Sequence, residues 1–140
     1  MDGKIELIPL AVEDVDRSVE FYGQTVGWNV DHDTQVHEGL RFVQVTPPGS
    51  ECSITFGAGM PQAEPGSYLG MHRVVTDIEA ARKQLVDAGV EVSEPFHFGA
   101  EGQTTGLHPE RASYGTYLSF SDPDGNGWLV QEVKVRNPDR

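Results

Sequence analysis

The sequence is poor in cysteine and in basic residues, and it has no long hydrophobic run. Its single cysteine, Cys52, excludes an internal disulfide framework and a zinc site built from several cysteines. Lys and Arg number 10 against 22 Asp and Glu, which gives a formal net charge of −12. Nucleic acids and anionic membranes are bound through cations, so this charge argues against both as partners and is compatible with a neutral or cationic small molecule. No apolar stretch approaches the roughly 18 residues of a membrane span, and we expect a soluble cytoplasmic protein.

The 140 residues fit one domain, and 37% hydrophobic residues are enough for a core. In the first part, an apolar run over 4–12 predicts a strand. Apolar residues at helical spacing after Asp14 predict a helix that Asp14 caps and Gly27 ends. Three further strands are predicted, over 28–36, 40–46 and 51–56.

The second part repeats this order. A strand over 68–75 is followed by a helix that Asp77 caps and Gly89 ends, with Asp77 lying 63 positions after Asp14. Three further strands are predicted, over 90–98, 115–121 and 128–135.

We therefore predict an α+β fold of two tandem βαβββ modules, over 4–57 and 68–135, with a linker at 58–67. One such unit leaves a sheet face uncovered, so the two modules are expected to pair. The second module carries extra residues over 99–115, which we interpret as a polar, Gly-rich loop.

Two motifs carry a family resemblance. The first opens the first helix as Val12-x-Asp14-x-Asp16-x-Ser18-x-x-Phe21-Tyr22, and the second is the hairpin turn Asp122-Pro123-Asp124-Gly125-Asn126. With the duplicated unit, they resemble the vicinal oxygen chelate superfamily, which includes glyoxalase I, extradiol dioxygenases, fosfomycin-inactivating transferases and bleomycin-binding proteins. The resemblance covers about residues 5–133 and implies a cupped, incomplete barrel around a cavity, often in a homodimer.

In metal-dependent members of that superfamily, four strand positions supply His and Glu ligands. The resemblance transfers these positions to Leu7, Ser53, Gly70 and Leu129. Leu and Gly have no side-chain donor and Ser is a rare ligand. We therefore expect no cofactor and no tightly bound divalent metal at these positions.

The same strand faces continue to other side chains by the strand period of two. Ser53, Thr55, His72 and Gln131 are predicted to line the cup among apolar walls, with His72 as the best candidate for a catalytic role. A hydrogen-bonded lining histidine without chemistry is the alternative. Glu132, an odd step from Leu129, is expected to point away from the cup.

Two residues of the loop over 99–115 are further candidates for ligand binding. Arg111 could pair with a carboxylate or phosphate of a ligand, or could form a salt bridge with one of the chain's acids. Tyr114 lies in the same loop, which is long enough to be a lid, a mobile excursion or an arm used by a dimer partner.

Three functions are compatible with these residues. The first is a small-molecule-binding protein without the metal quartet that sequesters a ligand, as in bleomycin resistance. The others are a glyoxalase- or dioxygenase-like lyase, isomerase or oxygenase with a relocated metal site, and a metal-free enzyme that uses His72. Unpaired sheet edges need cover, so a homodimer is expected.

Overall fold

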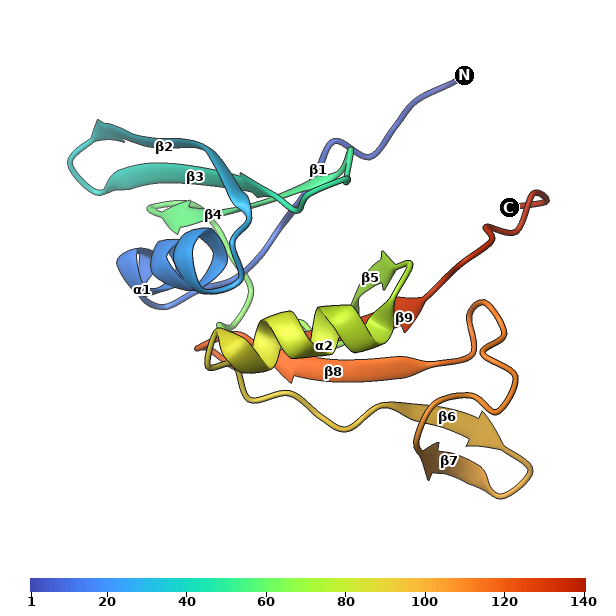
Figure 1. Ribbon diagram of the computed structural model, residues 1–140. Coiled ribbons are helices and arrows are strands. Elements are labelled where there is room, and N and C mark those ends of the chain that lie inside the picture. Colours follow the sequence, from blue (N-terminus) through green and yellow to red (C-terminus); the bar gives the residue numbers. More distant parts are fainter. The chain divides into compact units, whose positions relative to one another are not determined.

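The computed structural model describes residues 1–140 and divides them into two compact units. Unit 1 comprises Met1–Leu69 with Asp122–Asn126, and unit 2 comprises Gly70–Ser121 with Gly127–Arg140. Each unit consists of one sheet and one helical segment (Figure 1). The fold is mixed α+β, as the sequence predicts.

Unit 1 has a four-stranded sheet of order β1-β4-β3-β2. Strand β1 pairs with β4 in parallel, whereas the β4–β3 and β3–β2 pairs are antiparallel. The elements in chain order are β1 (Leu7–Pro9), α1 (Val15–Val19), the π-helix η1 (Glu20–Thr25), β2 (Asn29–His37), β3 (Leu40–Thr46) and β4 (Ser53–Ala58).

Unit 2 repeats this plan with one strand more, in the order β5-β9-β8-β6-β7. Its first and last strands, β5 and β9, again pair in parallel, so the internal repeat read from the sequence is present in the topology. The elements are β5 (Met71–Val75), α2 (Ile78–Asp87), β6 (Phe96–Gly99), β7 (Gly102–Thr105), β8 (Tyr117–Ser121) and β9 (Gly127–Glu132).

The helix boundaries follow the predicted caps. The Asp14 carboxylate accepts a hydrogen bond from the backbone N–H of Arg17, and that of Asp77 accepts from two N–H groups of the first turn of α2. Gly27 and Gly89 follow the helical segments with φ of 73° and 83°, a conformation that glycine adopts without steric cost. Neither the helical segment of unit 1 nor α2 has the length and apolar composition of a membrane-spanning helix.

The core of unit 1 lies on one face of its sheet. Tyr22 of η1 is fully buried, and its ring centre lies 5.2 Å from that of Trp28 and 5.8 Å from that of Phe56 in β4. Val43 and Val45 alternate with half-buried residues along β3 and are also fully buried. Each large apolar side chain buried here contributes about 1.5–3 kcal/mol.

The core of unit 2 forms in the same way. Helix α2 contacts β8 and β9 and buries Ile78 and Leu85. The side chains of Leu118 and Val130, which pair across β8 and β9, are buried. Core residues therefore occupy the alternate positions of these strands, and the intervening positions point to the other face.

One sequence expectation is wrong in unit 2. The segment 99–115, predicted as loop, contains strand β7, which pairs antiparallel with β6 across a turn at Ala100 and Glu101. Strand β6 is correspondingly shorter than the strand predicted over 90–98, where Val92 forms only an isolated bridge with Phe120. All four residues of β7 are exposed, so no apolar alternation marks this strand in the sequence.

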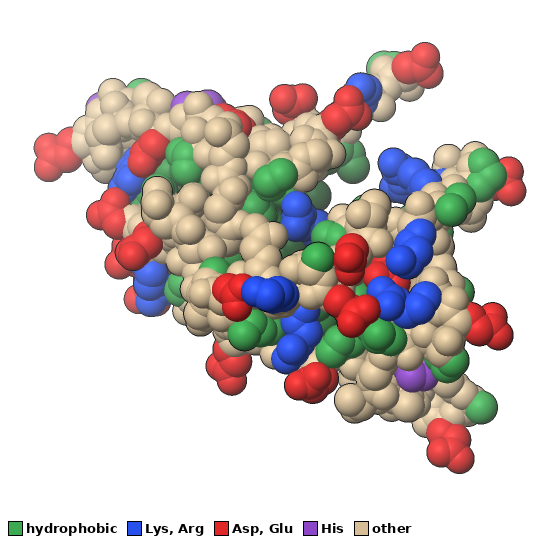
Figure 2. Space-filling model, viewed as in Figure 1, with side chains coloured by type: hydrophobic (Ala, Val, Ile, Leu, Met, Phe, Trp, Pro, Cys, Tyr) green, Lys and Arg blue, Asp and Glu red, His purple; other side chains and the backbone are tan.

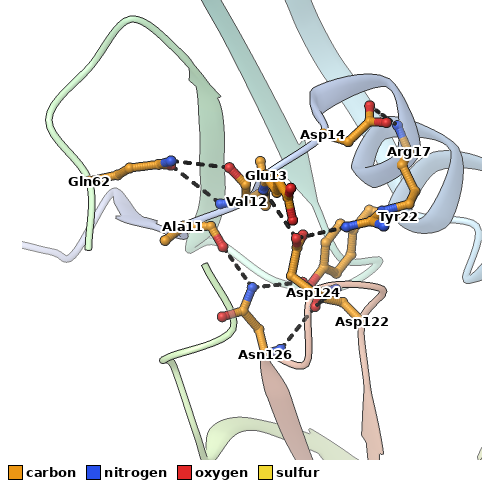
Figure 3. A network of polar contacts seen from close by, with 10 residues as sticks. All are labelled: Ala11, Val12, Glu13, Asp14, Arg17, Tyr22, Gln62, Asp122, Asp124 and Asn126. Carbon is orange, nitrogen blue, oxygen red and sulfur yellow. Dashed lines mark hydrogen bonds and ion pairs between the residues drawn. The ribbon is translucent and has the colours of Figure 1, made fainter. Parts of the chain in front are cut away.

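The turn Asp122–Asn126 joins β8 to β9 as the predicted hairpin and is itself part of unit 1. Figure 3 shows its polar contacts. The Asp122 carboxylate is buried and accepts from the Tyr22 hydroxyl at 2.8 Å, from the Asn126 side chain at 3.0 Å and from two backbone N–H groups. Asn126 Nδ2 also donates to the carbonyl of Ala11, and Arg17 donates to Asp124. The turn is therefore a structural part of unit 1.

Replacing Asp122 with Ala removes an acceptor from four donors, of which the Tyr22 hydroxyl and the Asn126 amide are buried. We expect the free energy of unfolding to fall by about 3 kcal/mol, measured by urea denaturation. Asp139→Ala, at an exposed carboxylate, is the matched control and should change stability by less than about 0.5 kcal/mol. Equal effects of the two substitutions would contradict this role of the turn.

Candidate functional site

The sheet of unit 2 has a face opposite α2 that carries most of the predicted site. His72 pairs with Leu129, Gln131 pairs with Tyr117, and Tyr117 pairs with Phe96. Paired residues of neighbouring strands point to the same face, and so do residues two apart in one strand, such as Leu129 and Gln131. These side chains of β5, β9, β8 and β6 therefore share one face of the sheet. Phe98 contacts the Tyr117 ring from the same side. We use the name His72 face for the five residues His72, Phe96, Phe98, Tyr117 and Gln131.

The polar part of the His72 face is a chain of hydrogen bonds. His72 Nε2 lies 2.7 Å from Gln131 Oε1. Gln131 Nε2 donates to the carbonyl of Tyr114 at 2.8 Å and to the hydroxyl of Tyr117 at 3.0 Å. Gln131 is buried, whereas His72 is exposed. The structure therefore brings two of the predicted lining residues into direct contact. The buried Gln131 amide is held by its other hydrogen bonds, and the His72 imidazole that it contacts is accessible to solvent.

The apolar part is a cluster of aromatic rings around Tyr117. The Phe96 ring stacks on it with centroids 5.7 Å apart, and the Phe98 ring meets it edge-on at 5.5 Å. The His72 ring lies 6.5 Å away, also edge-on. Phe98 is 60% exposed, which is unusual for a side chain of this size and leaves an aromatic surface available beside the imidazole.

The sequence pattern does not mark Phe96, Phe98 and Tyr117 as residues of the site. The pairs Phe96–Tyr117 and Tyr117–Gln131 depend on which residues of β6, β8 and β9 lie opposite one another, and this register is not encoded locally. The signal was present in part, because His97 lies between Phe96 and Phe98 and alternation places it on the other face. There its Nδ1–H donates to the carbonyl of Gly106, at 2.8 Å.

Arg111 forms a salt bridge, which is one of the two roles that its sequence position allows. Its guanidinium donates to both oxygens of Glu132, at 2.9 and 2.6 Å, and to Glu79 at 2.8 Å. Glu132 is fully buried and also accepts from the N–H of Ile78 at the start of α2. It therefore lies on the helix side of the sheet, away from Gln131.

The pKa values of this pair shift in the directions expected for a charge-assisted contact. Hydrogen bonds from Arg111 lower the pKa of Glu132 below its ordinary value and outweigh the opposing effect of burial. The hydrogen bond to Glu132, with a second to Glu79, raises the pKa of Arg111. Both groups are therefore charged across the physiological pH range.

Tyr114 supports the His72 face through its backbone. Its carbonyl accepts from Gln131, its N–H donates to the carbonyl of Glu132 at 2.8 Å, and its hydroxyl accepts from the N–H of Asn137 at 2.8 Å. Its φ of 70° is left-handed, which a residue with a side chain adopts only when its surroundings hold it there.

Ser53 and Thr55 belong to unit 1, where their hydroxyls are used within the sheet. Ser53 Oγ lies 2.6 Å from Thr46 Oγ1, and Thr55 Oγ1 donates to the carbonyl of Val43 at 2.8 Å. Thr46 in turn donates to Asp31. Partial burial raises the pKa of Asp31, but hydrogen bonds from Thr46, Asn29 and Gln44 outweigh it and give a net lowering. The role of Ser53 and Thr55 in ligand binding stays a prediction.

The residues at the four family metal positions do not fit a metal. Leu7 pairs with Ser53, and Ser53 Oγ already contacts Thr46. In unit 2 the residue paired with Leu129 is His72, two positions beyond Gly70. A single histidine beside a leucine offers one donor where a protein site needs three or four. No group of three or more His, Cys, Asp or Glu side chains is arranged to hold a metal ion.

Comparison with known proteins identifies the family. The sequence pattern of the Glyoxalase/Bleomycin resistance protein/Dioxygenase superfamily matches residues 4–130, and the chain belongs to this superfamily. Its resemblance to the vicinal oxygen chelate proteins, read from the two motifs, is thereby confirmed.

Among solved structures, TnmS3 from Streptomyces sp. CB03234, described as an antibiotic binding protein, is 27% identical, with 94% of this chain and 97% of that chain covered and a TM-score of 0.72. A member of the same superfamily from Sphaerobacter thermophilus is 28% identical, with 94% and 98% covered and a TM-score of 0.71. An uncharacterised protein, YetH of Bacillus subtilis, is 23% identical, with 92% of this chain and 98% of YetH covered.

The excess of acidic residues does not mark a site by itself. On the face seen in Figure 2, Asp and Glu side chains are scattered over the surface and several lie beside Lys or Arg. The net charge of −12 is therefore a general field, which favours approach of cations and disfavours anions.

Replacing Glu132 with Gln tests the buried ion pair. Because the pKa of Glu132 is lowered on folding, its stabilisation is complete above the ordinary pKa of a glutamate and is lost as the pH falls through the lowered value. We expect the variant to lose about 2 kcal/mol at pH 7, measured by urea denaturation, and the difference from wild type to shrink below pH ~4. Glu110→Gln, at an exposed carboxylate, should show neither effect. A difference that is constant down to pH ~2 would contradict the assignment.

Proposed function

We propose that this chain is a small-molecule-binding protein of the glyoxalase/bleomycin-resistance type and that its ligand lies on the His72 face, without a resident metal. The observation that carries the proposal is the juxtaposition of an exposed imidazole with an aromatic cluster whose Phe98 is exposed, on the sheet face opposite α2. Small-molecule sites are lined mostly by apolar and aromatic side chains with a few convergent polar groups, and the His72 face has this composition.

The three rings of Phe96, Phe98 and Tyr117 supply dispersion and stacking for a planar or apolar ligand. His72 and Tyr117 supply polar atoms at the edge of that surface. The similarity to TnmS3, described as an antibiotic binding protein, supports binding rather than catalysis as the first expectation. The lack of metal donors beside His72 supports it as well.

The ligand chemistry that fits is neutral or cationic. An anion would meet both the repulsive field of a chain with net charge −12 and a face without any Lys or Arg. The only arginine of the neighbouring loop, Arg111, is committed to Glu132 and Glu79 on the helix side.

The binding proposal is tested with 2-naphthol, a neutral aromatic probe that offers one hydroxyl. We expect saturable NMR shift changes at His72, Phe98 and Tyr117. His72→Ala and Phe98→Ser should each weaken binding about tenfold, because each removes a contact worth ~1.4 kcal/mol. Because both side chains are exposed, the unfolding temperature should stay within a few degrees of wild type.

Two substitutions in unit 1 serve as matched controls. His37→Ala removes an exposed imidazole and Val36→Ser removes an apolar side chain that is 52% exposed. Neither residue belongs to the His72 face, so neither should change the affinity for 2-naphthol. Shifts confined to unit 1, or equal losses in control and test variants, would refute the proposed site.

We further propose that the chain forms a homodimer. Each sheet ends in two edge strands, β1 and β2 in unit 1 and β5 and β7 in unit 2, and exposed edges are normally covered. Light scattering at micromolar concentration should give twice the chain mass of 15.3 kDa. A mass of one chain would contradict the dimer and leave the binding proposal intact.

A further inference from the structure

The orientation of the Gln131 side chain follows from its neighbours. A backbone carbonyl can only accept, so the group that Gln131 turns toward the Tyr114 carbonyl at 2.8 Å must be its NH₂. The same NH₂ reaches the Tyr117 hydroxyl, at 3.0 Å. The amide oxygen is thereby left to face His72 Nε2 at 2.7 Å, and an amide oxygen has no proton to donate.

The proton of the neutral imidazole must therefore sit on Nε2. Its other nitrogen, Nδ1, then carries a lone pair and makes no hydrogen bond within the protein. Since His72 is exposed beside the rings of Tyr117 and Phe98, that lone pair is available to a bound molecule.

The acceptor that orients the Gln131 amide is a backbone carbonyl, that of Tyr114, and so does not move when side chains rotate. Two further hydrogen bonds hold Tyr114 in place. Its backbone N–H donates to the carbonyl of Glu132, and its side-chain hydroxyl accepts from the N–H of Asn137. The preceding Ser113 hydroxyl accepts from the N–H groups of Lys134 and Val135, at 3.0 and 2.9 Å. The carbonyl therefore offers a fixed acceptor that selects one of the two orientations of the Gln131 amide.

We propose that Gln131 is a positioning residue that fixes His72 as the Nε2–H tautomer, so that the His72 face takes ligands that place a hydroxyl or N–H donor at Nδ1. This proposal has two parts. The ligand half, that ligands place a donor at Nδ1, rests on the proposed function. The tautomer half, that Gln131 fixes the proton on Nε2, does not, because it concerns the free protein.

The tautomer half is tested by ¹⁵N–¹H correlation on histidine-labelled protein without ligand, at about pH 8, where an ordinary histidine is neutral. We expect His72 to carry its proton on Nε2 in the wild type and in Tyr117→Phe, because the Tyr114 carbonyl still orients the amide. Gln131→Leu should give a mixture of both tautomers. A proton on Nδ1 in the wild type, or an unchanged tautomer in Gln131→Leu, overturns this half. The wild-type spectrum decides even where Gln131→Leu fails to fold.

The ligand half is tested with the matched probes 2-naphthol and 2-methoxynaphthalene, which differ in whether the oxygen carries a proton. We expect wild type to bind 2-naphthol about tenfold more tightly and His72→Ala to lose this preference. Equal affinity of wild type for both probes would overturn donor selection while the proposed function stands. Binding of neither probe at the His72 face would overturn the proposed function and the ligand half together.

Discussion

Two buried polar residues that follow one another in β9 determine the arrangement of unit 2. Gln131 and Glu132 are both buried, and strand alternation turns them to opposite faces of the sheet. A buried amide or carboxylate without partners costs several kcal/mol, so both must find hydrogen bonds. Glu132 finds them in the N-terminus of α2 and in Arg111, whereas Gln131 finds them in Tyr114, Tyr117 and His72. Glu132 thus stabilises the contacts on the helix side of the sheet, and Gln131 positions the polar groups of the candidate site.

The loop that contains Arg111 and Tyr114 serves both faces. Each of the two residues has a left-handed φ, 51° and 70°, a conformation that costs an L-residue about 1–2 kcal/mol. Hydrogen bonds to Glu132, from the Arg111 guanidinium and from the Tyr114 N–H, compensate for this conformation. Strain retained beside a candidate site is typical of segments that must hold a group in a fixed place, and here that group is the Tyr114 carbonyl.

The sequence predicts those features that local chemistry decides. Asp14 and Asp77 cap their helices because a carboxylate satisfies free N–H groups wherever it precedes a helix. The family resemblance marks Gly70 and Leu129, and the strand period of two continues their faces to His72 and Gln131. The structure joins these two side chains by a hydrogen bond. Strand β7 was missed because its residues are polar and exposed. The aromatic cluster was missed because Phe96 meets Tyr117 only through the register of two strands that are distant in sequence.

The hydrogen bond of His72 resembles one half of the arrangement of a metal-ligating histidine. Ligating histidines in general fix one ring nitrogen through an N–H donated to a carbonyl and present the other to the metal. His72 is fixed in the same way by the Gln131 amide, but the residue paired with it is Leu129 and the one two positions before it is Gly70. His72 therefore presents a single lone pair, at Nδ1, without a second donor on the paired residue Leu129. With no second donor to share a cation, that lone pair has the proton of a hydroxyl or N–H as its chemical complement.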